Sequence, residues 1–177
     1  KINQILITSC TLSSAKVLNK FKFKKTIHQF FPIDVNFITK RFLKYWKPKV
    51  CIFLESEIWP NIIKNIKEEN LPLILLNARI TKKSFKRWKK INFFSKKLFN
   101  MFDLCLPQNQ ETTKYLTKLD SKKIKFIGNL KLCDVKEKSN ANLNSKQIKF
   151  FNSKNIILIG YSTHQTEENF CSEIFKN

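Results

Sequence analysis

The stretch of sequence that decides the fold spans residues 50–61 and reads Val-Cys-Ile-Phe-Leu-Glu-Ser-Glu-Ile-Trp-Pro-Asn. Its first five residues are apolar, with β-branched and aromatic members, which is typical of a buried strand. The apolar run ends at Glu55 and Glu57, and Pro60 then suits the first turn of a helix, where its missing N–H costs little. The stretch therefore predicts a buried strand that leads directly into a helix.

The two carboxylates in this stretch have two interpretations. In open parallel sheets ligands bind at the carboxyl ends of the strands, so Glu55 and Glu57 are candidates for a functional site. Acidic side chains are also favourable at helix N-termini, so the same residues are candidate caps of the helix expected over residues 58–69. The remainder of the chain has to decide between the two.

Strands and helices are expected to alternate along the whole chain. Apolar runs predict further strands at residues 5–8, 26–31, 71–76, 104–106, 124–127 and 156–159. Helices are expected at residues 12–20, 34–46 (with Asp34 as N-cap), 58–69, 81–102, 110–119, 146–151 and 167–176. The alternation predicts an α/β fold: a Rossmann-like parallel-sheet domain over residues 1–133, a linker over 134–154, and the start of a second domain over 155–177.

Composition indicates a folded protein with an unusual charge. The 177 residues include 17 Phe and are 42% hydrophobic, which is ample for a core, and the net charge is +21. Such a charge favours a polyanionic partner: nucleic acid, an acidic membrane surface or a phosphorylated substrate. Nearly all the basic residues are Lys, so a compositional bias acting on solvated faces is the alternative explanation. The basic amphipathic stretch 81–102, where lysines surround Phe85, Trp88 and Phe94, also has two interpretations. It contacts anionic lipid, or it is an ordinary helix with a solvated lysine face.

The sequence lacks the motifs that mark several classes of protein. The chain has no G-x-G-x-x-G and no Walker loop, and its apolar runs are shorter than the roughly 18–20 residues that span a bilayer. The five cysteines show no metal-ligand spacing, and Cys10, Cys51 and Cys105, in or beside apolar runs, are expected to be buried thiols in a reducing cytosol. Because the chain begins with Lys1 and ends in mid-pattern, we expect it to be a fragment of a longer protein.

The distinctive polar residues share one position, directly after a predicted strand. They are Ser9, Glu55, Glu57, Asn77, Arg79, Gln108, Asn129, Lys131, Ser162, Thr163 and His164. The two glycines of the chain, Gly128 and Gly160, lie at strand ends as well, where tight turns favour them. The carboxyl ends of parallel strands meet at one edge of a sheet, so the shared position favours a functional cleft over helix capping. His28 lies inside a predicted strand and is expected to be structural.

Four sequence blocks carry a family resemblance. They are Glu-Ser-Glu-Ile-Trp-Pro-Asn at 55–61, Asn-Ala-Arg-Ile at 77–80, Gly-Asn-Leu-Lys at 128–131, and Ser-Thr-His at 162–164 followed by Glu167 and Glu168. In order and spacing they resemble the 3-deoxy-D-manno-octulosonic acid (Kdo) transferases of lipopolysaccharide biosynthesis. The resemblance implies the N-terminal half of a GT-B glycosyltransferase plus the opening of its second domain. It also implies metal-independent, cofactor-free, inverting transfer of Kdo from CMP-Kdo to a lipid A precursor, at the cytoplasmic face of the bacterial inner membrane.

The resemblance also implies roles for individual residues. Glu55 and Lys131 match the residues thought to support the transition state, and a cation beside developing negative charge is chemically sensible. Substrate contacts are expected from Glu57, Asn77, Arg79, Asn129, Ser162, Thr163, His164 and Glu167. The family's general base would precede Lys1 and most of its donor pocket would follow Asn177, so the fragment alone is expected to be inactive. Thr81 and Thr166 depart from the family pattern, which has Ser and Gly there.

Two other functions remain alternatives at this stage. The net charge of +21 is compatible with a basic α/β module that binds nucleic acid or an anionic surface, although no recognition motif accompanies it. A GT-B glycosyltransferase with a different sugar donor is the second alternative. The Kdo assignment itself implies a CMP-Kdo donor, a lipid A precursor acceptor and an anionic membrane surface as partners, and no nucleic acid.

Overall fold

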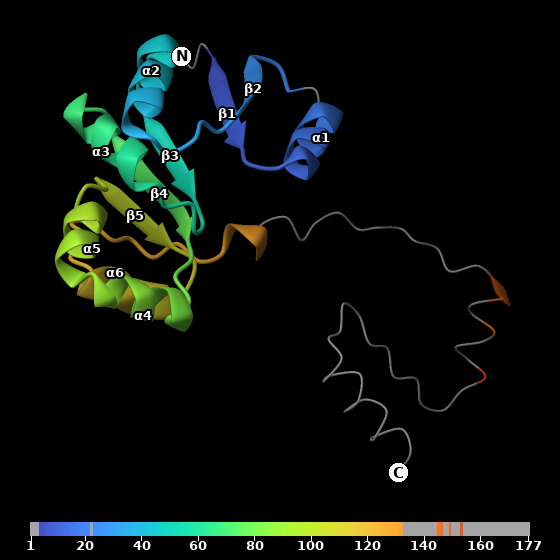
Figure 1. Cartoon of the computed structure of the whole chain (residues 1–177). Helices are drawn as coiled ribbons and strands as arrows, with labels where there is room; N and C mark the ends of the chain where they lie inside the picture. Colours follow the sequence, from blue (N-terminus) through green and yellow to red (C-terminus); the bar gives the residue numbers. More distant parts are fainter. Residues whose placement is uncertain (1–3, 22, 133–144, 147–148, 150–152, 154–177) are drawn as a thin grey trace. The chain divides into compact units, whose positions relative to one another are not determined.

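A computed structural model describes residues 4–21, 23–132, 145, 146, 149 and 153 of the chain (Figure 1). The chain divides into two compact units, Lys1–Asp134 and Val135–Asn177. The architecture below is that of the first unit. The predicted strand 156–159 and helix 167–176 lie outside the described residues, as does nearly all of the predicted linker 134–154, and these remain predictions.

Parallel strands alternate with helices through the first unit. The order is β1 (Ile5–Ser9), α1 (Leu12–Phe21), β2 (Thr26–Phe30), α2 (Asn36–Trp46), β3 (Cys51–Leu54), α3 (Pro60–Glu68), β4 (Leu73–Ala78), α4 (Lys82–Lys90), α5 (Asn92–Phe99), β5 (Leu104–Pro107) and α6 (Gln110–Lys118), followed by a 3-10 turn at Leu130–Leu132. β1 pairs with β2, and β3, β4 and β5 form a three-stranded sheet in that order. Both sheets are parallel, which confirms the predicted α/β class.

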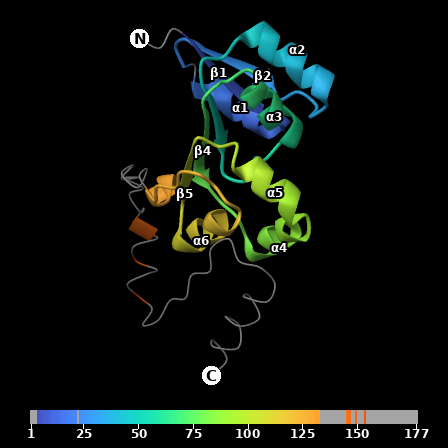
Figure 2. The same ribbon diagram turned by 90° about the vertical axis from the view of Figure 1, so that its left-hand side faces the viewer.

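The hydrophobic core is built around β4, the middle strand of the three-stranded sheet. Leu73 and Leu75 of this strand are fully buried, as are Phe99 and Phe102 after it in the chain. Both views of the fold show α2 beside α3 at one end, and α4, α5 and α6 gathered near β5 at the other (Figures 1 and 2). Burial of large apolar side chains, at about 1.5–3 kcal/mol each, is the main stabilising contribution to this arrangement.

Asp34 caps a different helix from the one expected. The N-cap of α2 is Val35, whose side chain makes no capping bond. The Asp34 carboxylate instead accepts hydrogen bonds from the backbone N–H groups of Asn61 (3.0 Å) and Ile62 (2.8 Å) at the start of α3. Pro60 has no N–H to offer and Trp59 makes no side-chain cap, so α3 depends on this carboxylate from a distant segment.

The predicted helix 81–102 is two helices separated at Ile91. Ile91 ends α4 and begins α5, with φ −111° and ψ 47°, and its N–H bonds to the Trp88 carbonyl three residues back. The bend lets both helices reach the core: Phe85 stacks on Tyr115, and Trp88 packs edge-on against Phe99. Phe85 and Trp88 therefore pack against the core, whereas Phe94 of α5 is exposed.

The predicted strand 124–127 is reduced to a single bridge. Ile124 pairs with Cys105, the only bridge recorded outside the named strands of the described chain. The N–H of Cys105 bonds to the Lys123 carbonyl, and the Lys125 N–H bonds to the Cys105 carbonyl. The next rung would need an N–H at residue 107, which is a proline, so the ladder stops there.

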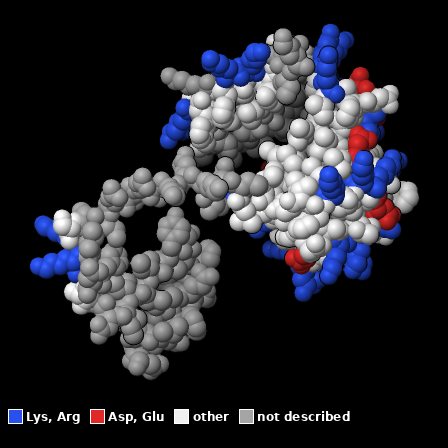
Figure 3. All heavy atoms as spheres, turned by 180° about the vertical axis from the view of Figure 1, so that it is seen from behind, with Lys and Arg blue, Asp and Glu red and all other residues white. Residues whose placement is uncertain are grey.

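The described surface is strongly basic. Lys and Arg side chains are spread over the face shown in Figure 3, with a few acidic side chains among them. Several acidic residues are paired with lysines, including Glu68 with Lys40 (3.0 Å) and Asp120 with Lys96 (3.0 Å). Within the residues described, no helix combines the length and the apolar character needed to cross a membrane.

Candidate functional site

Glu55 directly follows β3 and has an unusual backbone conformation. Its φ is 54°, in the left-handed region that residues with a Cβ seldom adopt. Its N–H bonds to the Leu76 carbonyl (3.0 Å), and its own carbonyl accepts the N–H of Arg79 (3.1 Å). Glu55 is thus bonded on both sides to the end of β4, which holds the strained conformation in place. Strain of this kind, retained by the surrounding structure, is common at functional sites.

The Glu55 side chain forms an ion pair with Lys131. The distance between Glu55 Oε1 and Lys131 Nζ is 2.9 Å, and the two side chains are 34% and 67% exposed. Solvent reaches both groups, so the pair itself adds at most about 1 kcal/mol to stability. The structure therefore brings together the two residues assigned to transition-state support, and leaves both accessible to a ligand.

The interpretation of Glu55 and Glu57 as caps of the following helix is wrong. The free N–H groups at the start of α3 bond to Asp34, as described above. Glu57 accepts a hydrogen bond from Trp59 Nε1 (2.7 Å), and Glu55 pairs with Lys131. Neither glutamate is needed at the helix, which leaves the strand-end site as the remaining interpretation.

The end of β1 lies near Glu57. Cys10 follows this strand; partial desolvation, assisted by the negative charge of Glu57, raises the pKa of its thiol. The expected burial of Cys10 is wrong, since it lies exposed in the bend before α1. Cys105 is buried as expected, whereas Cys51 is only partly buried. Desolvation raises the pKa of each of these two thiols to about 11.

The turn that carries Lys131 is ordered by its own residues and by Asn77. Gly128 has φ 84°, a conformation that favours glycine. Asn129 accepts the Lys131 N–H with its side chain (3.1 Å) and the Leu132 N–H with its carbonyl (3.0 Å). Asn77 Oδ1 accepts the Leu130 N–H (3.2 Å). Asn77 and Asn129 therefore act on the turn beside the ion pair.

The other predicted site residues that the structure describes follow or end β1, β4 and β5, and the Arg79 backbone N–H bonds to Glu55. Arg79 follows β4 with an exposed side chain. Ser9 Oγ is 2.8 Å from Nε2 of His28, which lies in β2 as expected for a strand histidine. The backbone N–H of Gln108 bonds to the Ala78 carbonyl. The remaining candidates, Ser162, Thr163, His164 and Glu167, lie outside the described residues.

Three residues support the site although the sequence did not predict them as part of it. Ser56 donates to the Arg79 carbonyl (2.7 Å), Trp59 donates to Glu57, and Asp34 anchors the helix that follows them. Ser56 and Trp59 lie in the Glu-Ser-Glu-Ile-Trp-Pro-Asn block, so their place in that block was an available signal. The contact of Asp34 with α3 had no comparable signal, because its partner N–H on Asn61 lies 27 residues later in the chain.

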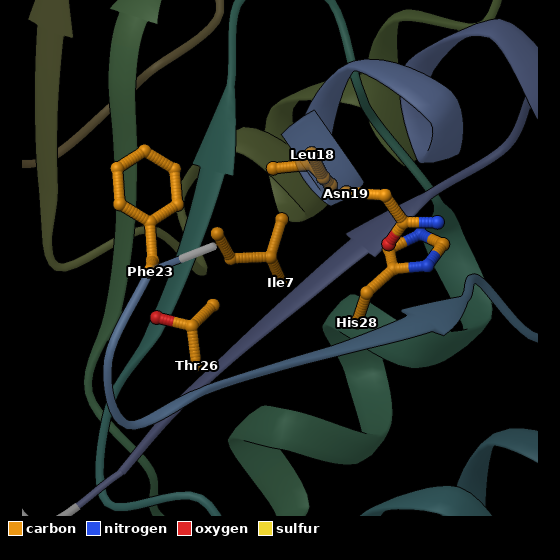
Figure 4. Close-up of a pocket in the computed structure, with 6 residues that line it drawn as sticks. All are labelled: Ile7, Leu18, Asn19, Phe23, Thr26 and His28. Atoms are coloured by element: carbon orange, nitrogen blue, oxygen red, sulfur yellow. The ribbon is translucent and has the colours of Figure 1, made fainter. Parts of the chain in front are cut away.

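Two cavities lie at the N-terminal end of the unit. An open groove of about 760 Å3 combines cations with aromatic and apolar side chains, and is lined by Gln29, Pro32, Ile38, Arg41, Phe42, Lys44, Tyr45 and Trp46. A pocket of about 260 Å3 is lined by Ile7, Leu18, Asn19, Phe23, Thr26 and His28 (Figure 4). These residues belong to β1, α1, β2 and the loop that joins α1 to β2. The smaller pocket contains no predicted site residue.

The arrangement provides charge of both signs at one strand edge. A carboxylate is able to stabilise a developing cation, and an ammonium group a developing anion, when both are held close to the reacting atoms. Among the described residues, no group of three or more His, Cys, Asp or Glu side chains is placed to hold a metal ion. The ion pair of Glu55 and Lys131 itself offers electrostatic stabilisation.

Comparison with known proteins places these features in context. Residues 1–133 match the family model described as 3-Deoxy-D-manno-octulosonic-acid transferase (kdotransferase). A Rickettsia felis 3-deoxy-D-manno-octulosonic acid transferase is 35% identical over 174 residues, which is 98% of this chain and 37% of that protein. A probable mitochondrial 3-deoxy-D-manno-octulosonic acid transferase of Arabidopsis thaliana is 44% identical over 84 residues, 48% of this chain and 19% of that protein. The chain thus spans less than half the length of these relatives.

Proposed function

The chain belongs to the 3-deoxy-D-manno-octulosonic acid (Kdo) transferase family, and we propose that its Glu55–Lys131 pair serves the transfer of Kdo from CMP-Kdo to a lipid A precursor. The observation that carries the proposal is the 2.9 Å contact between these two side chains. They come from separate blocks of the family resemblance, and they meet beyond the carboxyl end of β3, at the edge of the sheet where α/β proteins bind ligands.

The charges of the pair suit the reaction. When the bond between the anomeric carbon of Kdo and the CMP phosphate breaks, the sugar gains cationic character and the departing phosphate oxygen gains negative charge. The bond to the acceptor oxygen then forms, the acceptor hydroxyl gives its proton to a general base, and CMP leaves. Glu55 is suited to stabilising the sugar cation and Lys131 the phosphate. Because Lys131 is 67% exposed, it is free to exchange part of its contact with Glu55 for one with the donor.

The test uses the intact protein that contains this chain. It is incubated with CMP-Kdo and a tetra-acylated lipid A precursor, and the mass of the acceptor is recorded. We expect the acceptor to gain Kdo, and Glu55→Gln and Lys131→Ala each to lower the rate by roughly a hundredfold or more, as for loss of one preorganised electrostatic contact. Lys114→Ala, which removes an exposed lysine of α6, is the matched control and should retain the wild-type rate.

Two results would contradict the proposal. An unchanged acceptor mass, obtained with folded wild-type protein, would contradict transfer of Kdo and would favour a different sugar donor. Retention of the wild-type rate in Glu55→Gln and Lys131→Ala places the chemistry elsewhere. Circular dichroism of each variant establishes that a lost rate is not a lost fold.

The proposal includes an anionic membrane surface at the cytoplasmic face of the bacterial inner membrane, where a lipid acceptor would be met. It is supported by the groove along α2, in which Arg41 and Lys44 lie beside Tyr45 and Trp46. Tyr45 is 77% exposed, and on α5 Phe93 is 86% exposed. Aromatic side chains next to cations are suited to an interface between headgroups and acyl chains.

Vesicle binding tests this part. We expect the protein to sediment with vesicles of phosphatidylcholine and phosphatidylglycerol, and much less with phosphatidylcholine alone. Arg41→Ala and Lys44→Ala should each weaken binding roughly fivefold, the effect of about 1 kcal/mol per cation, whereas Lys114→Ala should not. Binding that ignores lipid charge would contradict the membrane proposal. Steeply salt-dependent binding to RNA in its place would favour the nucleic-acid alternative.

A further inference from the structure

Asn77 interrupts the pairing of β4 with β5. In the register of these strands Leu76 lies opposite Leu106 and Ala78 opposite Pro107, so Asn77 is the extra residue of a β-bulge. Its φ is 52°, a left-handed conformation that Asn tolerates better than most residues. Bulges redirect side chains and are frequent beside active sites. This one directs the Asn77 amide toward the turn that carries Lys131.

The Asn77 side chain is buried and bonded within the protein. The residue is 4% exposed, and its Oδ1 accepts the N–H of Leu130, which lies 53 positions later in the chain. Lys131, the next residue, places its Nζ 2.9 Å from Glu55 Oε1. The amide thus fixes the backbone immediately before the lysine of the proposed site.

The backbone around Asn77 fixes Glu55 as well. Leu76, just before it, accepts the Glu55 N–H, and Arg79, two residues after it, donates its N–H to the Glu55 carbonyl. One short segment of β4 therefore contacts both halves of the ion pair: Glu55 through its backbone, and Lys131 through the Asn77 amide. We propose that Asn77 is a positioning residue that sets the register of Lys131 against Glu55, in place of the substrate contact expected from the sequence.

Two substitutions separate the side chain from the backbone conformation. Asn77→Gly keeps the left-handed φ at no steric cost and removes the acceptor for Leu130. Asn77→Asp keeps an acceptor oxygen in a residue that also tolerates this conformation. The bulge is expected to survive in both variants. Because Asn77→Asp also adds a charge at a buried position, the exchange rate of the Leu130 amide, rather than overall stability, reports on the hydrogen bond.

Amide hydrogen exchange gives a readout that needs no activity. In Asn77→Gly we expect the Leu130 amide to exchange roughly five- to tenfold faster, the effect of losing one net hydrogen bond. The Leu75 amide of the core serves as the internal reference, and its exchange rate should change less than twofold. In Asn77→Asp the exchange rate of the Leu130 amide should stay within about twofold of the wild-type rate. Unchanged Leu130 exchange in Asn77→Gly would overturn the proposal.

The catalytic part of this inference rests on the proposed function and is tested by a double-mutant cycle in the intact protein. Asn77→Gly should lower kcat about tenfold with little change in KM, Asn77→Asp should restore most of it, and Asn77→Gly should cost nothing further in a Lys131→Ala background. An equal loss with and without Lys131 would show a merely structural role. If the wild type transfers no Kdo, the proposed function fails, while the exchange experiment still decides whether Asn77 holds the turn.

Discussion

Removal of the Asp34 carboxylate is expected to destabilise α3, although Asp34 directly precedes α2 in the chain. In Asp34→Ala the N–H groups of Asn61 and Ile62 lose a charged acceptor at 3.0 Å and 2.8 Å. The Asn61 side chain keeps its bond to the Asp34 backbone carbonyl, so the two segments stay in contact. Loss of an N-cap costs about 0.5–2 kcal/mol, and two charge-assisted bonds place this case near the upper end, at about 2 kcal/mol.

Urea denaturation followed by tryptophan fluorescence measures this loss, because Trp59 lies at the start of α3. A change of about 2 kcal/mol moves the urea midpoint by about 1 M, and lowers the Tm by roughly 4–8 °C for a chain of this size. Asp34→Asn, which keeps one acceptor oxygen, should lose about half as much. The variant thus provides a graded control at the same position.

Amide hydrogen exchange shows which helix is destabilised in Asp34→Ala, and it is able to refute the prediction. If Asp34 caps α3, exchange accelerates at Asn61 and Ile62. If it caps α2, as the sequence alone predicts, exchange accelerates in residues 36 and 37 instead. An unchanged urea midpoint in Asp34→Ala, or acceleration confined to the start of α2, would show that the contacts at Asn61 and Ile62 contribute little.

The remaining predictions concern one charge and one packing contact. Burial raises the pKa of Asp103, but the hydrogen bonds from Lys67 (2.9 Å) and the Leu73 N–H (2.8 Å) outweigh it, so the pKa is lowered from 3.8. The stability that this lowered pKa contributes is complete above the pKa of Asp103 in the unfolded chain and is lost as the pH falls through its pKa in the folded protein. Asp103→Asn should therefore cost about 1 kcal/mol of unfolding free energy at pH 7. The difference in urea midpoint between wild type and variant should vanish in acid. Phe99→Ala should cost about 3–5 kcal/mol because its side chain is fully buried, whereas Phe93→Ala on the same helix, 86% exposed, should stay within about 0.5 kcal/mol in the same titration.

The sequence determined the order and type of nearly every described element. Apolar runs that end in polar residues predicted the parallel strands, and apolar residues at helical spacing predicted the helices between them. These patterns are readable because they depend on neighbours within a few positions. The position of Glu55 at a strand end was readable for the same reason, whereas Lys131 lies in a 3-10 turn beyond the single bridge at Ile124.

Only the tertiary structure decided which partners those residues meet. The carboxylate of Asp34 bonds to α3, the bulge at Asn77 directs its amide to Leu130, and Pro107 stops the ladder at Cys105. Each of these depends on a donor or acceptor far away in the chain, whose position is set by packing of the sheet and its helices. A local pattern carries no information about such a partner, because its free energy arises only when folding brings the two groups within hydrogen-bonding distance.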